Sequence, residues 1–161
     1  MGSEMCIRDS SPGVDVLRQA SGLPGMSVLQ FGFGGSPEGN PHFPANITAD
    51  RVVYTGTHDN DTVVGWHAQA SPDERARVEA VFGAMTDPHV RLAEAALDSP
   101  GVAAFIPVQD LLGLGAEARF NTPGNPQGNW GWRMSDLQLT TLAAAAGTWK
   151  QRLKAANRLS A

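Results

Sequence analysis

The pattern of apolar and polar residues divides the chain into short strands and longer amphipathic helices. Runs rich in β-branched and aromatic residues predict strands at Ser27–Phe33, Val52–Thr57 and Val102–Gln109. Pro107 cannot donate a hydrogen bond to a sheet, so the third strand is expected to end near it. Because helical segments separate the strands, we expect crossover connections and a parallel sheet.

Five segments predict helices. Ser11 and Pro12 offer an N-cap and a first helical position, and Ser71–Glu74 is typical of a capping box. Two more helices are expected from Val63 and Asp87, and the last one closes the chain. The apolar residues that share a face, grouped by helix, are Val14, Leu17 and Ala20; Val78, Val81, Phe82 and Met85; Val90, Ala93 and Leu97; and Leu139, Leu142, Ala146, Trp149, Leu153 and Ala156, with Trp149 expected in the core.

Two stretches rich in Gly, Pro and Asn, residues 34–49 and 111–132, have no clear period and are expected to be loops. Three strands are few for a parallel sheet, which is normally covered on both faces. The predicted fold class is therefore α/β, as part of an incomplete TIM (β/α)8 barrel. Residues 1–10, MGSEMCIRDS, fit none of these patterns and are interpreted as a non-native or gene-end segment.

Composition and charge narrow the classes of function. Charged residues make up 17% of the 161 residues, and the net charge of −4 lacks the basic character of a nucleic-acid-binding protein. No apolar run is long enough to predict a membrane span, so neither nucleic acid nor membrane is an expected partner. The start lacks the apolar core of a signal peptide, which predicts a cytoplasmic location. The single cysteine, Cys6, excludes an internal disulfide.

The stretch Tyr54–Thr62, with the sequence YTGTHDNDT, carries the strongest chemical signal. It continues the strand that begins at Val52 and places the pair His58-Asp59 where the strand gives way to a helix. In an α/β barrel the catalytic groups lie at the carboxyl ends of the strands, so this stretch is interpreted as an active-site loop. The residues available to cap the following helix are Asn60, Asp61 and Thr62.

Several of these side chains have alternative roles. Asp59 by itself could be a loop carboxylate that caps a helix, and Asp61 is interpreted as such a cap. A metal site formed by His58, Asp59 and Asp61 lacks the support of a second ligand cluster. Trp130 and Trp132 could stack on sugar faces or pack in a core.

Polar residues after the third predicted strand are further candidates. Asn121, Gln109 and Asp110 lie where the barrel arrangement places substrate contacts. Asp110 has a structural alternative, as the partner of Arg119 or Arg133. The sequence leaves both roles open for this carboxylate.

Several uncommon sequence blocks occur together in one order. They are Gly22–Met26, Val28–Phe31, Tyr54–Asp61, Gln109–Gly115, Glu117–Arg119, Asn121–Gly124, Gly128–Trp130 and the pair Trp132-Arg133. In this order and spacing, the chain from Ser11 to its end resembles the carboxyl-terminal third of the 4-α-glucanotransferases. That family is also called amylomaltases or disproportionating enzymes, and it forms glycoside hydrolase family 77.

The resemblance implies a retaining transfer of α-1,4-glucan segments between maltooligosaccharides, with no cofactor and no metal. The family uses a nucleophilic Asp after the fourth barrel strand, an acid/base Glu after the fifth and a stabilising Asp after the seventh. Ser27–Phe33, Val52–Thr57 and Val102–Gln109 resemble the sixth, seventh and eighth strands. Residues 11–161 are accordingly expected to be the carboxyl-terminal portion of a catalytic barrel.

By the same resemblance, Asp59 matches the third, stabilising carboxylate. A fixed ionised carboxylate stabilises the positive charge of an oxocarbenium-like transition state, and the neighbouring His58 favours the ionised form. The expected substrate-binding residues are His58, Asn60, Asn121 and Trp130.

The other two carboxylates have no match in this sequence. The strand of the nucleophile would lie upstream, and counting back from Pro12 puts the acid/base residue at Met5. Glu4 lies next to it but lacks the matching surroundings. The isolated chain is therefore expected to be inactive, with the missing amino-terminal part of the barrel as its partner. The alternative interpretation is a non-catalytic α-glucan-binding module.

Overall fold

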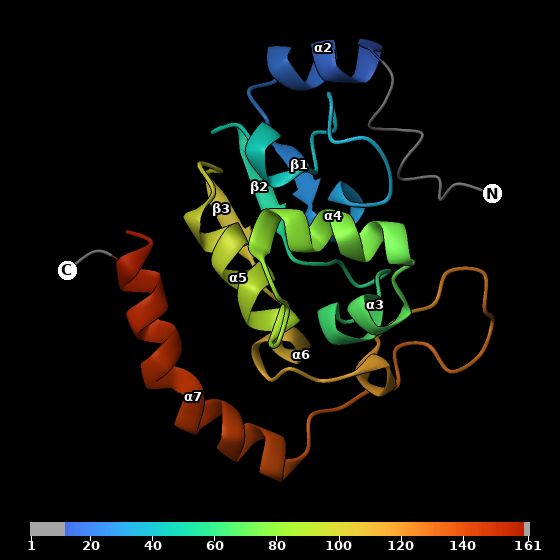
Figure 1. The fold of residues 1–161 in the computed structure, drawn as a ribbon, viewed down its shortest axis with the longest axis vertical. Coiled ribbons are helices and arrows are strands. Elements are labelled where there is room, and N and C mark those ends of the chain that lie inside the picture. Colours follow the sequence, from blue (N-terminus) through green and yellow to red (C-terminus); the bar gives the residue numbers. More distant parts are fainter. Residues whose placement is uncertain (1–11, 160–161) are drawn as a thin grey trace.

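The computed structural model describes residues 12–159, and Figure 1 shows a three-stranded sheet with helices packed beside it. The elements in chain order are α2 (Pro12–Ala20), β1 (Gly25–Val28), β2 (Arg51–Tyr54), α3 (Val63–Gln69), α4 (Pro72–Phe82), α5 (Pro88–Asp98), β3 (Ala103–Phe105), α6 (Val108–Leu111) and α7 (Asp136–Ala155), with 3-10 turns at Leu29–Gly32, Pro44–Asn46 and Ala116–Ala118. The predicted cap Ser11 and the segment 1–10 lie outside the described residues.

The sheet has the order β1-β2-β3 and both strand pairs are parallel, which confirms the predicted parallel sheet. Within the described part of the chain no further strand pairs with β1 or β3, so the sheet is open. Pairing ends in one row, where Val28 lies opposite Tyr54 and Tyr54 opposite Phe105. All three strands therefore lead into loops at the same, carboxyl edge of the sheet.

Each strand is shorter than predicted. β1 ends at Val28, where the chain turns into a 3-10 helix, and the third predicted strand divides into β3 and α6. Gly32 lies in the first of these turns, and a Cβ there would be 2.7 Å from the carbonyl oxygen of His42. That close approach of two backbone segments requires glycine. Pro107 stands at the N-cap of α6, so the strand ends before it as expected.

The core lies between one face of the sheet and the helices. Its buried members are Leu29, Ile47, Val53, Val63, Leu92 and Ala96, with Trp66, Phe82, Met85, Ala95 and Ala104 packed against them. Val53 of β2 pairs with Ala104 of β3, so this row of the sheet faces α3 and α5. Burial of each large apolar side chain stabilises the fold by about 1.5–3 kcal/mol, which fixes the helices against this face.

The opposite face of the sheet is uncovered. Tyr54 and Phe105 stack there with ring centroids 5.3 Å apart, and Phe105 is 56% exposed. Together with Met26 they line a cavity of about 380 Å³. An exposed pair of aromatic rings on a sheet is typical of a surface that other protein covers.

Local caps set the helix boundaries. Ser71 accepts a hydrogen bond from the Glu74 backbone and begins α4. The Glu74 side chain does not return that bond but accepts one from the indole of Trp66 at 3.2 Å, so the predicted capping box is half formed. Val78 is buried as predicted, whereas Val81 is 40% exposed, which corrects the predicted inward face of α4.

The two terminal helices are amphipathic but little covered. In α2, Val14 is 42% and Leu17 68% exposed. No residue of α7 is buried, and Leu139 is 55% exposed. Trp149 is half-buried beside the Arg152 guanidinium, 4.9 Å from its ring centroid, so its predicted place in the core is wrong. In Figure 1, α7 lies along the outside of α5.

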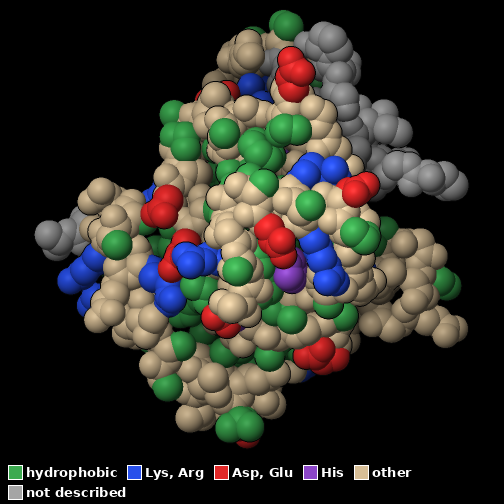
Figure 2. Space-filling view, viewed as in Figure 1, with side chains coloured by type: hydrophobic (Ala, Val, Ile, Leu, Met, Phe, Trp, Pro, Cys, Tyr) green, Lys and Arg blue, Asp and Glu red, His purple; other side chains and the backbone are tan. Residues whose placement is uncertain are grey.

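The described helices include none that is long and apolar enough to cross a membrane. On the face seen in Figure 2, acidic and basic side chains are interspersed over α4 and α5. Such mixing of both signs is typical of a solvated outer surface.

Candidate active site

The loop of residues 56–62 connects β2 to α3 at the carboxyl edge of the sheet. Thr62 is the N-cap of α3, since its Oγ1 accepts a hydrogen bond from the Gly65 amide at 3.1 Å. The prediction that Asp61 caps this helix is wrong. Asp61 precedes the N-cap residue: its Oδ1 accepts a hydrogen bond from the Thr62 amide and its Oδ2 accepts one from the Gln69 side chain near the end of α3.

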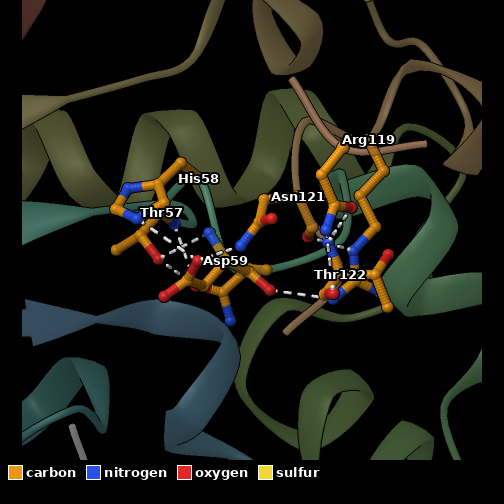
Figure 3. A network of polar contacts seen from close by, with 8 residues as sticks. Thr57, His58, Asp59, Arg119, Asn121 and Thr122 are labelled. Atoms are coloured by element: carbon orange, nitrogen blue, oxygen red, sulfur yellow. Dashed lines mark hydrogen bonds and ion pairs between the residues drawn. The ribbon is translucent and has the colours of Figure 1, made fainter. Parts of the chain in front are cut away.

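Asp59 lies in the middle of this loop, and its side chain is 31% exposed. Its Oδ1 accepts a hydrogen bond from Asn121 Nδ2 at 2.6 Å and lies 3.2 Å from His58 Nε2 (Figure 3). Among residues 12–159, the other oxygen, Oδ2, has no hydrogen-bond partner. One oxygen of the carboxylate is therefore held in place, and the other is available to a ligand.

Arg119 holds the backbone of the same loop. Its Nη2 donates to the Asp59 carbonyl at 2.8 Å and its Nε to the Asn121 carbonyl at 2.8 Å, as Figure 3 shows. Its Nη1 lies 4.0 Å from Asp61 Oδ2. A planar guanidinium thus connects the loop after β2 to the segment after α6 and fixes Asp59 relative to Asn121. The sequence placed Arg119 in a recognisable block but indicated only Asp110 as its partner.

Asn60 closes the turn that presents Asp59. Its Oδ1 accepts from the Thr57 amide at 2.9 Å and from the Thr57 hydroxyl at 2.7 Å. Within the described chain its Nδ2 has no hydrogen-bond partner. The oxygen of the Asn60 side chain therefore stabilises the turn, and its amide nitrogen is available to a ligand.

Gln30 supports the loop from beneath and was not predicted as a site residue. It is 4% exposed, and its Nε2 donates to the Asp61 carbonyl at 2.9 Å. A Cβ on Gly56 would lie 2.6 Å from this nitrogen, so a larger residue there would push the Gln30 amide from its place. The signal for Gln30 in the sequence was a polar side chain inside the predicted strand Ser27–Phe33.

Asp110 is 2% exposed, and its partners differ from those predicted. Its Oδ2 accepts from the Thr55 hydroxyl at 2.6 Å and its Oδ1 from the Val63 amide at 2.8 Å. Arg119 is engaged by the loop instead, and Arg133 donates to the carbonyls of two tryptophans. Burial raises the pKa of the Asp110 carboxyl, and the bonds from Thr55 and Val63 act against that rise.

Two half-buried histidines lie outside this network. Burial is the main cause that lowers the pKa of both His67 and His89. His67 Nε2 and His89 Nδ1 are buried without a hydrogen-bond partner in the part of the chain that the structure describes. Both imidazoles are therefore favoured in the neutral form.

Aromatic rings continue the site beyond His58. The ring of Trp130 lies 5.2 Å from that of His58 and 5.6 Å from that of Phe120, and Trp130 is 53% exposed. Trp132 is half-buried against Phe120, with ring centroids 5.9 Å apart. Trp130 has φ of 61°, a left-handed conformation that costs a bulky residue on the order of 1–3 kcal/mol. The structure thus separates the two tryptophans into one packed and one presented to solvent.

Cavities open around the loop. One of about 260 Å³ is lined by most of residues 56–62 together with Pro107, Gln109, Asp110 and residues 118–120. The cavity on the uncovered sheet face also reaches His58. Asp59 lines another, of about 270 Å³, shared with Asn60 and Arg119. The loop therefore presents His58, Asp59 and Asn60 to open space on more than one side.

The described residues contain no group of three His, Cys, Asp or Glu side chains that could hold a metal ion. His58, Asp59 and Asp61 were the set considered in the sequence. Asp61 is turned toward Gln69 and Arg119, while His58 and Asp59 face each other.

Of the predicted site residues, His58, Asp59, Asn121 and Trp130 come together although up to 72 positions of chain separate them. Asp59 lines an open cavity, and the neighbouring His58 contacts the exposed indole of Trp130. Such an arrangement is suited to binding a neutral polar ligand with an apolar face, such as a sugar.

Comparison with known proteins identifies the family. The model of glycoside hydrolase family 77, described as 4-alpha-glucanotransferase, matches residues 10–140. A 4-alpha-glucanotransferase of Thermus thermophilus is 49% identical over 139 residues, covering 81% of this chain and 28% of that protein. One from Synechocystis is 45% identical over 132 residues, covering 80% and 26%. This chain belongs to the 4-alpha-glucanotransferase family.

A solved structure extends the likeness to the fold. The amylomaltase from Streptococcus agalactiae, in complex with acarbose, superposes with a TM-score of 0.85 at 26% sequence identity. The match covers 93% of this chain and 30% of that one. The chain spans about a quarter of the length of the curated relatives it matches.

Proposed function

We propose that this chain is the carboxyl-terminal portion of the catalytic (β/α)8 barrel of a 4-α-glucanotransferase. In this proposal β1, β2 and β3 are the sixth, seventh and eighth barrel strands, and residues 11–161 are the catalytic portion, without residues 1–10. The open sheet and its uncovered aromatic face support it, because a closed barrel leaves no strand edge unpaired.

The reaction is a retaining transfer of α-1,4-glucan segments between maltooligosaccharides. A nucleophilic carboxylate attacks the anomeric carbon while an acid gives its proton to the departing glucan oxygen. The acceptor hydroxyl then loses its proton to the same residue and displaces the carboxylate. Both of these groups belong to the amino-terminal part of the barrel, the partner of this chain. The chemistry requires no cofactor.

Asp59 is the residue of this chain that acts on the reaction. Positive charge develops on the sugar ring in each transition state, and a preorganised carboxylate stabilises it without reorganising. The observation that carries this assignment is that the two carboxylate oxygens of Asp59 have different surroundings. Oδ1 is braced by Asn121 and His58, and Oδ2 has no partner in residues 12–159 and can meet the sugar.

Substrate contacts surround this carboxylate. The exposed ring of Trp130 stacks on the apolar face of a glucose unit, which accounts for an otherwise costly backbone conformation. His58, which is 54% exposed, and the amide of Asn60 donate to sugar hydroxyls. When Asn121 contacts the substrate, it keeps its hydrogen bond to Asp59.

The test uses a complete enzyme, made by joining the amino-terminal part of the Thermus thermophilus relative to residues 11–161. It should convert maltotriose into glucose and longer maltodextrins. Asp59→Asn keeps the shape and removes the charge, and should lower kcat on the order of 10²–10³-fold. Oligosaccharide binding, measured by calorimetry, should change far less.

Asp98→Asn is the control, because Asp98 is an exposed carboxylate at the end of α5. It should leave kcat unchanged. An Asp59→Asn enzyme that keeps its full activity would overturn the assigned role of Asp59.

A non-catalytic α-glucan-binding module is the second candidate, favoured by the exposure of Trp130 alone. It predicts that the 161-residue chain binds maltoheptaose by calorimetry and that Trp130→Ala abolishes this binding. Binding by the chain together with an inactive complete enzyme would favour the module over the transferase.

A further inference from the structure

The loop that carries Asp59 is closed at its base by a single buried carboxylate. Thr55 directly precedes the loop and Val63 directly follows it. The hydroxyl of Thr55 donates to Asp110 Oδ2 at 2.6 Å, and the amide of Val63 donates to Asp110 Oδ1 at 2.8 Å. Asp110 comes from α6, far along the chain from either donor.

These two bonds are strong and shielded from solvent. Thr55 is fully buried, Val63 is fully buried and Asp110 is 2% exposed. A separation of 2.6 Å lies at the short end of the range for a hydrogen bond donated by a hydroxyl. Since the loop has seven residues, fixing both of its ends at one side chain restricts where Asp59 can lie.

We propose that Asp110 is a positioning residue for Asp59: its carboxylate joins the two ends of the 56–62 loop and thereby sets where the Asp59 carboxylate stands. The inference rests on the proposed function, in which the placement of Asp59 determines the rate. Asp110 touches neither substrate nor the reacting atoms in this proposal. It acts through the backbone that it ties together.

Two other side chains also hold the 56–62 loop, but at different points from Asp110. Gln30 holds the Asp61 carbonyl from one side, and Arg119 holds the Asp59 carbonyl from another. Neither of them reaches Thr55 or Val63, so neither replaces the joint at the base. Without Asp110 the tip of the loop stays attached and the Thr55 amide still donates to the Phe105 carbonyl at 3.4 Å, but the link between Thr55 and Val63 is lost, which displaces the Asp59 carboxylate rather than releasing the loop.

The geometry predicts that shape, and not charge, is what Asp110 supplies. An asparagine at this position keeps an oxygen for the Val63 amide and offers its NH2 to the Thr55 oxygen, so both links survive. Burial already raises the pKa of the carboxyl, since the charged form is disfavoured there. The contrast with Asp59 is direct, because Asp59 is required for its charge.

The experiment compares Asp110→Asn, Asp110→Ala and Thr55→Val in the complete enzyme described above. Asp110→Ala should lower kcat on the order of 10²-fold, the effect of a displacement of about 1 Å, and should change KM less. Asp110→Asn should retain most of the wild-type kcat. Thr55→Val removes one of the two links, so its kcat should lie between those of Asp110→Asn and Asp110→Ala. Combining Thr55→Val with Asp110→Ala should lower kcat by less than the product of the two separate effects, because both act on the same joint.

Val78→Ala provides the control for a merely structural role. Val78 is fully buried in α4, so its truncation lowers stability without altering the loop joint. All rates are expressed per folded molecule, with the folded fraction taken from circular dichroism at the assay temperature. Val78→Ala should then show the wild-type kcat.

Three outcomes decide the matter. An Asp110→Ala enzyme with the kcat of Val78→Ala would overturn the positioning role. An Asp110→Asn enzyme as slow as Asp110→Ala would also overturn it, because charge rather than shape would then be needed. Failure of the proposed function looks different: the complete enzyme would be inactive, or Asp59→Asn would be active, whatever Asp110 does.

Discussion

The two faces of the three-stranded sheet differ in how completely this chain covers them. On the helical face, Val53 is fully buried against α3 and α5, and the core cluster continues through Leu92 and Ala96. On the other face, Tyr54 and Phe105 stack on each other and Phe105 is 56% exposed. Adjacent residues of the same strand thus have opposite surroundings, as the alternation of side chains along a strand requires.

The difference explains how this chain holds a site in place. Side chains of this chain tether the Asp59 loop, among them Gln30 after β1, Asp110 in α6 and Arg119 after it. The uncovered face contributes open space and exposed rings next to His58. The chain therefore arranges one carboxylate by itself, and in the proposed function other protein forms the wall opposite that carboxylate.

The largest expected effect is the complete absence of turnover by the 161-residue chain alone. In the proposed function the nucleophile and the acid/base belong to the amino-terminal part of the barrel and not to this chain, so no glycosyl-enzyme intermediate can form on the chain alone. Incubation of purified chain with maltotriose, followed by separation of the sugars, should give no glucose above a blank. Turnover by the chain would mean that the two faces are not divided in this way.

The next effect compares a buried residue packed on the covered face with an exposed residue of the uncovered face. Leu92→Ala should lower the free energy of unfolding by about 2–5 kcal/mol, because it leaves a cavity in a packed core. Phe105→Ala should cost little in the 161-residue chain, where the ring is exposed, and far more in the complete enzyme, where the remaining strands cover it.

Urea unfolding of both forms measures the two changes. Phe105→Ala should also reduce the binding of a hydrophobic dye to the 161-residue chain, since it removes part of an exposed apolar surface. An equal cost of Phe105→Ala in both forms would show that no further protein covers this face.

The smallest effect is a loss of stability in acid. Burial lowers the pKa of His67 and His89 in the folded state, so below the ordinary histidine pKa the unfolded chain binds more protons. This contribution to stability is complete above pH of about 6.5 and is lost as pH falls toward the lowered values. The raised pKa of Asp110 has the opposite effect, because it adds stability as the pH falls. That effect belongs to the pH range between the ordinary Asp pKa and the raised value.

Thermal unfolding of the complete enzyme at pH 7.5 and pH 5.5 measures the loss. The double variant His67→Gln, His89→Gln should flatten the dependence over that range, and His58→Gln, in an exposed ring, serves as the control. A dependence that the double variant leaves unchanged would assign the acid sensitivity to other groups.

The sequence by itself determined the elements and their order, because the signals for them are local. Runs of β-branched residues, prolines and N-cap serines each act on the backbone within one turn or one strand. Thus β2, α4 and α5 lie where the periodicity predicts. The chemistry of the Asp59 loop was also recognisable, since His58 and Asp59 follow a strand directly in the chain.

Only the tertiary structure decided which partners meet and which apolar faces are covered. The bond from Asn121 to Asp59 and the joint at Asp110 connect residues 47 to 62 positions apart, and no local pattern encodes such distances. Trp149 and Val81 lie at helical spacing but outside the core, because periodicity marks an apolar face without showing what packs on it. The two faces of the sheet differ for the same physical reason: burial depends on neighbours that the strand itself does not supply.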